Sequence, residues 1–136
     1  MDDILITLAG PAMNLVLCLL FVLVGLALGV SSDDPTSRNL GRFLVSGMLM
    51  NIGLFCFNLI PIPPLDGSRI FYRLGLYSLE LFTTLSQYGF IILIILINLP
   101  VFKGVLWYLQ ALILSPFLWV WPGDLQEFLN FLMVGR

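Results

Sequence analysis

Residues 57–69 read Phe57-Asn58-Leu59-Ile60-Pro61-Ile62-Pro63-Pro64-Leu65-Asp66-Gly67-Ser68-Arg69. The stretch closes a long apolar segment with a carboxylate, Asp66. Its three prolines remove backbone donors and prevent a helix from continuing, so we expect extended, irregular backbone here. Such backbone is tolerated at membrane depth only where protein buries it or where it lines a water-filled cavity. The stretch therefore predicts a broken helix next to a site.

The composition of the whole chain is that of a membrane protein. Of its 136 residues, 60% are hydrophobic and only 10% are charged, and the mean hydropathy is +1.04. By these values the chain is far more apolar than an ordinary soluble domain. The formal charge of -2 and the six scattered basic residues leave no basic face for a phosphate backbone, which excludes nucleic-acid binding.

Three uncharged runs predict membrane-spanning helices, at residues 4–30, 43–62 and 81–99. At about 1.5 Å per residue, each run matches or exceeds the hydrocarbon core of about 30 Å. We predict an all-α, multi-pass transmembrane helix bundle that forms a single membrane domain over residues 1–136.

The remaining segments are shorter or more polar. A polar connection is expected at residues 31–42 because this segment collects charges and a proline. Residues 105–121 are a fourth span candidate that Pro116 interrupts, so they form either a kinked span or a re-entrant helix. Residues 125–134 are expected to lie amphipathically on the surface.

By charge and position alone, Asp66 is as consistent with a helix cap at the membrane edge as with a functional ligand. Asp-Gly after Pro-Pro is also typical of a turn, and we expect a helix to restart near Gly67 or Ser68 with Asp66 capping its free N–H groups. A carboxylate within a membrane costs about 2.5 to 3.5 kcal/mol on insertion scales, so it usually pairs, coordinates or faces a cavity. The broken backbone beside Asp66 favours the ligand.

Polar and small residues mark faces of the first two spans. Asn51 and Asn58 are seven residues apart and share a helix face, for which hydrogen bonding between helices is the simplest explanation. In the first span, Pro11 suits a first helical position. Gly10 and Asn14 lie one turn apart on one face, and packing and a functional role both remain open for Asn14.

Together, Ala9-Gly10-Pro11-Ala12-Met13-Asn14 and the stretch 57–69 closely resemble the site-2 protease family of intramembrane zinc metalloproteases. Residues 87–93 are also similar to the helix that follows in its bacterial members. The resemblance covers about residues 4–100. It implies that the protein is a zinc metalloendopeptidase that cuts transmembrane protein or peptide substrates. It also implies that the protein is integral to the bacterial cell membrane.

In that family, zinc is bound by the two His of an HExxH helix and by the Asp of a Leu-Asp-Gly motif, with the HExxH Glu as general base. The resemblance therefore implies that Asp66 is the third zinc ligand. It implies site-shaping or substrate-proximal positions for Asn58, Pro61, Gly67, Gly10 and Asn14.

The chain departs from this pattern because it contains no His. Neither Glu80 nor Glu127 lies in an HExxH setting, and Cys18 and Cys56 lie in apolar runs typical of buried, small hydrophobic residues. We therefore predict no catalytic residue within these 136 residues, because a catalytic zinc ordinarily needs three protein ligands.

The leading expectation is that the chain is the C-terminal part of a site-2-type protease. Its HExxH helix would then come from lost sequence before Met1 or from a second polypeptide. Two other functions remain open. One is a metal-free pseudoprotease that acts as a membrane binding or regulatory module. The other is a small transport subunit, since a discontinuous helix with one Asp is also typical of ion sites.

Overall fold

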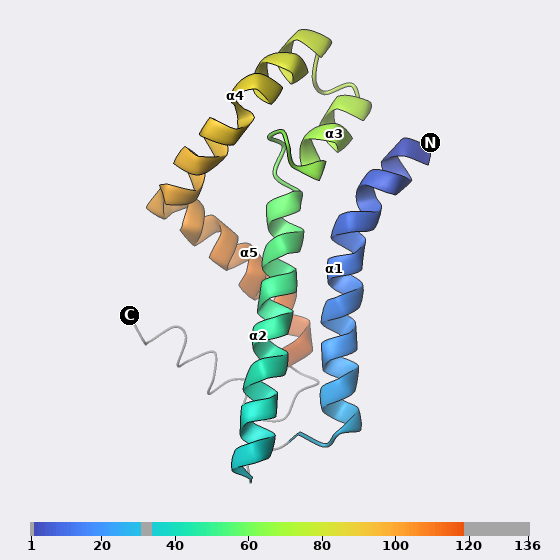
Figure 1. Cartoon of the computed structure of the whole chain (residues 1–136), viewed down its shortest axis with the longest axis vertical. Coiled ribbons are helices and arrows are strands. Elements are labelled where there is room, and N and C mark those ends of the chain that lie inside the picture. Colours follow the sequence, from blue (N-terminus) through green and yellow to red (C-terminus); the bar gives the residue numbers. More distant parts are fainter. Residues whose placement is uncertain (1, 31–33, 119–136) are drawn as a thin grey trace.

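The computed structural model describes residues 2–30 and 34–118, and these residues form helices and no strand (Figure 1). The helices are α1 (Asp2–Ala27), α2 (Pro35–Asn58), α3 (Asp66–Arg73), α4 (Leu79–Asn98) and α5 (Pro100–Leu118). Three of them are long and apolar enough to cross a membrane: α1 from Ile6, α2 and α4. The all-α class with three candidate spans is therefore confirmed.

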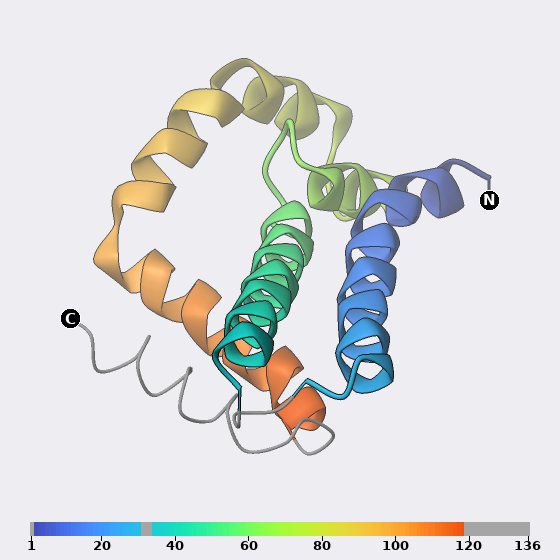
Figure 2. The same ribbon diagram turned by 60° about the horizontal axis from the view of Figure 1, so that its bottom comes forward.

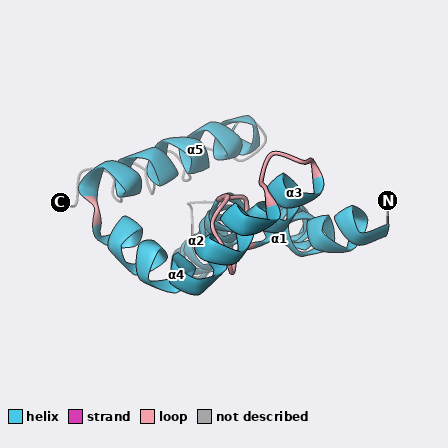
Figure 3. Cartoon of the chain, turned by 90° about the horizontal axis from the view of Figure 1, so that it is seen from above, coloured by secondary structure: helices cyan, strands magenta, loops and turns pink. Residues whose placement is uncertain are grey.

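The helices are arranged around an antiparallel pair. α1 and α2 lie side by side, and the short α3 packs against α1 at the end where α1 begins. α4 then leads away from this pair, and α5 turns back from the end of α4 to pack on α2 (Figures 2 and 3). The loop between α2 and α3 thus lies at the end of the bundle where α1 enters.

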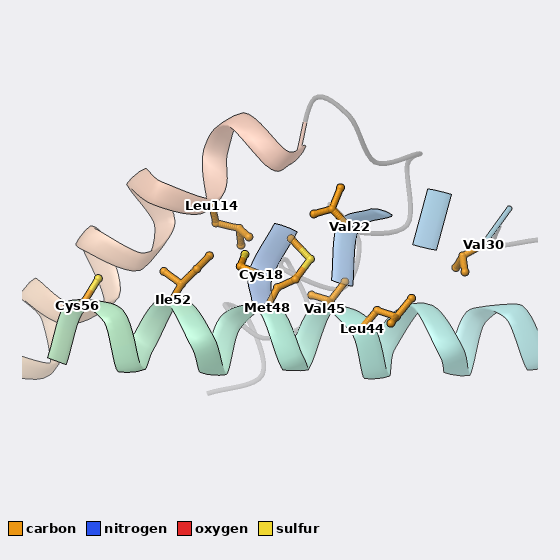
Figure 4. Close-up of a cluster of buried hydrophobic side chains, with 9 residues drawn as sticks. All are labelled: Cys18, Val22, Val30, Leu44, Val45, Met48, Ile52, Cys56 and Leu114. Carbon is orange, nitrogen blue, oxygen red and sulfur yellow. The ribbon is translucent and has the colours of Figure 1, made fainter. Parts of the chain in front are cut away.

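A buried apolar cluster joins α1, α2 and α5. Every third or fourth residue of α2 points into it, so one stripe of the helix meets both neighbours (Figure 4). Close contact of α1 with α2 also depends on Gly47, where an added Cβ would lie 2.7 Å from the ring of Phe21. The buried members of the cluster are Cys18, Val22, Val30, Leu44, Val45, Met48, Ile52, Cys56 and Leu114.

The second span differs from its predicted bounds at both ends. α2 begins at Pro35, because Asp34 caps it by accepting a hydrogen bond of 2.9 Å from the Ser37 N–H and proline fits the first helical position. Most of the connection expected at residues 31–42 is therefore helical. α2 ends at Asn58 rather than at residue 62, since the helix cannot continue into the prolines of the stretch.

The prediction for Pro11 is wrong, because Pro11 lies inside α1 and is fully buried. An interior proline lacks the N–H for the intrahelical bond and kinks a helix. Figure 1 shows the first turns of α1 tilting away from the rest of the helix. The bend turns the start of α1 away from α2.

Residues 105–118 of the fourth span candidate belong to α5, which begins earlier, at Pro100, and runs through Pro116 to Leu118. α5 is not among the three described helices that meet the length and hydropathy of a membrane span. The remainder of this candidate, and the surface segment expected at residues 125–134, lie outside the described residues.

Candidate functional site

A non-helical loop of residues 59–65 joins α2 to α3, as the prolines predict. Short-range backbone bonds shape it: the Ile62 N–H donates to the Ile60 carbonyl at 2.9 Å, and the Leu65 N–H donates to the Ile62 carbonyl at 3.0 Å. The peptide bond between the two adjacent prolines is cis. This segment is called the proline loop below.

Asp66 is the first residue of α3, so the helix restarts one or two residues earlier than predicted. The N-cap residue is Leu65, and no side chain caps the helix there. Within the described part of the chain, the Asp66 carboxylate accepts no hydrogen bond. The helix-cap interpretation of Asp66 is therefore wrong, and its carboxylate, half-buried at a helix N-terminus that favours negative charge, is left open for another partner.

The structure brings Gly10 of α1 against this carboxylate. A Cβ built on Gly10 would lie 3.1 Å from Oδ2 of Asp66, so the missing side chain leaves the space that the carboxylate occupies. Gly10 lies four residues inside the apolar span that begins at Ile6, or about 6 Å along the helix axis at 1.5 Å per residue. Asp66 is thus near the end of the apolar layer at which α1 enters.

Gly67 lies where the start of α3 packs on the first residues of the proline loop. It is buried, and an added Cβ would overlap the backbone carbonyls of Leu59 and Ile60. Only glycine permits so close an approach of two backbone segments. Asp66 therefore supplies the carboxylate, and Gly67 allows α3 to pack closely on the preceding backbone.

Two partly buried asparagines lie near the same end of the bundle. Asn14 is one turn beyond Gly10 in α1, and Asn58 is the last residue of α2. Neither side chain makes a hydrogen bond among the residues that the structure describes, and neither is hydrogen-bonded to Asp66. Their amides are therefore available, like the carboxylate of Asp66.

Asn51 behaves differently from Asn58. Its amide donates to the Gly47 carbonyl of its own helix at 2.8 Å, so the predicted bond between helices is wrong. The hydroxyls of Thr84 and Ser86 in α4 bond in the same way, to carbonyls one turn earlier. Such polar side chains meet their hydrogen-bonding needs within their own helix and do not indicate a site.

The described residues do not by themselves fit a zinc ion. They include no group of three or more His, Cys, Asp or Glu side chains placed to hold a metal. Cys18 and Cys56 are free and buried in the apolar cluster, as predicted. Asp66 is therefore a single oxygen donor, fewer than the three ligands of a catalytic zinc site.

Sequence reasoning missed two residues that hold the proline loop. The Tyr77 hydroxyl donates to the Pro61 carbonyl at 2.6 Å, and Gly89 of α4 packs directly on the Pro63 carbonyl. Both contacts join segments far apart in the chain, so no local pattern marks them. The one available signal was the motif at residues 87–93, which contains Gly89.

Among curated proteins, the chain is similar to a protein of Bacillus subtilis (strain 168) named "Putative zinc metalloprotease YwhC". The two are 37% identical over 108 residues. The match takes in 76% of this chain and 49% of that protein, so the chain spans about half the length of the curated relative it matches. No family model matches the chain. No solved structure matches it.

Proposed function

We propose that this chain is the Asp-bearing part of an intramembrane zinc metalloendopeptidase of the site-2 protease type, acting on transmembrane proteins or peptides in the bacterial cell membrane. The observation that carries the proposal is the half-buried Asp66 carboxylate, which meets Gly10 near the end of an apolar span and has no partner in the described structure. The similarity to a protein named as a zinc metalloprotease supports the same activity.

In this proposal each residue of the candidate site has one role. Asp66 supplies one oxygen ligand to zinc, and Gly10 leaves the space in which that carboxylate lies. Gly67 fixes the start of α3 against the first residues of the proline loop. The open amides of Asn14 and Asn58 are available to the backbone of an unwound substrate. The other zinc ligands and the general base come from an HExxH-bearing helix outside residues 1–136, in the same polypeptide or in a second one.

The experiment uses the assembly that contains this sequence, isolated whole from its native membrane in mild detergent. We expect it to cleave a transmembrane helical peptide in liposomes and to lose cleavage when 1,10-phenanthroline removes zinc. We expect peptide mapping of the assembly to find an HExxH segment. An assembly that binds the peptide but never cleaves it contradicts the proposal and favours a binding module, and cation flux without cleavage favours a transport subunit.

Gly10→Ala tests the contact between α1 and Asp66. Because the added Cβ lies 3.1 Å from Oδ2, the carboxylate must move by a few tenths of an ångström. We expect cleavage by the assembly to fall about tenfold, the lower range for changes that reorient a metal ligand. Gly104→Ala is the matched control, since its Cβ meets nothing within 4 Å. Equal activity of the two variants contradicts this role of Gly10.

A further inference from the structure

We propose that Tyr77 is a positioning residue, which fixes the proline loop and thereby the place of Asp66, and that Gly89 provides a second hold on the same loop. The inference rests on the proposed function only in taking Asp66 as the group that has to be positioned. The contacts themselves are independent of any metal.

The first contact that fixes the proline loop is a short hydrogen bond. The Tyr77 hydroxyl donates to the Pro61 carbonyl at 2.6 Å, across 16 residues of sequence, within the usual range for an O–H···O bond. A backbone carbonyl in irregular structure at membrane depth needs a partner inside the protein. The two recorded backbone bonds within the loop are local, whereas Tyr77 ties the loop to the segment between α3 and α4.

Tyr77 is anchored to α3 through its ring and to α4 through the next residue in the chain. Its ring packs against Phe71 of α3, with centroids 5.7 Å apart. The following residue, Ser78, caps α4 by accepting a bond of 3.2 Å from the Leu81 N–H. The hydroxyl is therefore placed by two helices rather than by a flexible side chain alone.

The α3–α4 junction around Tyr77 is also packed. Tyr72 of α3 stacks on Phe82 of α4, with centroids 4.7 Å apart and ring planes at 27°. This pair holds the two helices together beside Tyr77. The backbone position of Tyr77 is therefore fixed relative to both helices.

The second hold is a direct backbone contact. Gly89 is buried, and an added Cβ would overlap the Pro63 carbonyl, so α4 lies directly on the loop at this point. Pro61 and Pro63 are thus both held from outside the loop, five and three residues before Asp66. Because α3 follows the loop immediately, a shift of the loop moves the start of α3 and the carboxylate with it.

Tyr77→Phe removes the hydroxyl and keeps the ring. In the full protein in lipid nanodiscs, we expect the Ile62 and Leu65 amides to exchange with deuterium about fivefold faster, the factor for loss of one typical hydrogen bond. The Ile52 amide in the core should not change. Tyr88→Phe is the matched control, because Tyr88 is 55% exposed on α4 and has no hydrogen bond among the described residues.

A second readout follows Asp66 itself. With Gly10→Cys and Asp66→Cys in one chain, a short thiol cross-linker should join the two positions, and we expect the rate to fall about fivefold when Tyr77→Phe is added. Adding Tyr88→Phe should leave the rate unchanged. Faster exchange without a slower cross-link overturns the positioning role, because Tyr77 then stabilises the loop without placing Asp66.

Gly89→Ala gives an independent variant. We expect the same two loop amides to exchange at least about fivefold faster, because the new Cβ displaces the Pro63 carbonyl, while Gly104→Ala leaves them unchanged. Unaltered exchange and cross-linking in both Tyr77→Phe and Gly89→Ala overturn the inference and leave the proposed function standing. Absence of zinc from the native assembly overturns the proposed function and leaves these contacts as they are.

Discussion

Asp66→Asn is expected to lower cleavage of a transmembrane substrate by the native assembly at least about 100-fold. The change keeps the size of the side chain but replaces an anionic oxygen donor by a neutral amide. Changes to groups that only support a metal ligand cost about 10- to 100-fold, and loss of the ligand should reach or exceed the top of that range. Initial rates of peptide cleavage in liposomes measure the effect.

Asp34→Asn is the matched control for this change. Asp34 caps α2 at the end of the helix opposite the proline loop, and asparagine is about as good an N-cap as aspartate. We therefore expect normal expression and normal cleavage. If both variants cleave at the rate of the unchanged protein, Asp66 is not a ligand of the catalytic metal.

Gly67→Ala is expected to give a large loss of folding stability. Its Cβ would overlap backbone carbonyls of Leu59 and Ile60, which cannot rotate away as a flexible side chain can. Overpacking costs about 1 to 3 kcal/mol and occasionally more, so we expect about 3 kcal/mol here. Unfolding of the purified protein in mixed micelles of increasing SDS content measures this loss.

Gly104→Ala again provides the comparison, in α5. Its Cβ meets no atom within 4 Å, and alanine is favoured over glycine within a helix by about 0.5 to 1 kcal/mol. This variant should therefore be as stable as the unchanged protein or slightly more so. Equal destabilisation by both changes contradicts the close docking of α3 on the proline loop.

The parts of the fold that could be predicted are those set by local composition. Apolar runs of sufficient length identified the three helices that can cross a membrane, because hydropathy depends on a single segment at a time. The break after α2 followed from the prolines, whose effect on backbone donors is independent of context. The burial of Cys18 and Cys56 followed from their apolar neighbours.

The parts that could not be predicted depend on contacts between distant segments or on competing local bonds. Pro11 lies inside α1 and is buried by the surrounding fold, which its local pattern does not show. Asn51 bonds within its own helix although its spacing from Asn58 indicated a shared face. The approach of Gly10 to Asp66 joins α1 to α3, and only the folded chain reveals it.

Zinc ligation by Asp66 is tested by the zinc content of the assembly isolated whole from its native membrane, measured by inductively coupled plasma mass spectrometry. We predict about one zinc ion per Asp66-bearing chain. Asp66→Asn should lose at least about 90% of this zinc under the same washing conditions, and Asp34→Asn should retain it. Equal zinc in the unchanged protein and in Asp66→Asn would contradict the assignment of Asp66 as a zinc ligand.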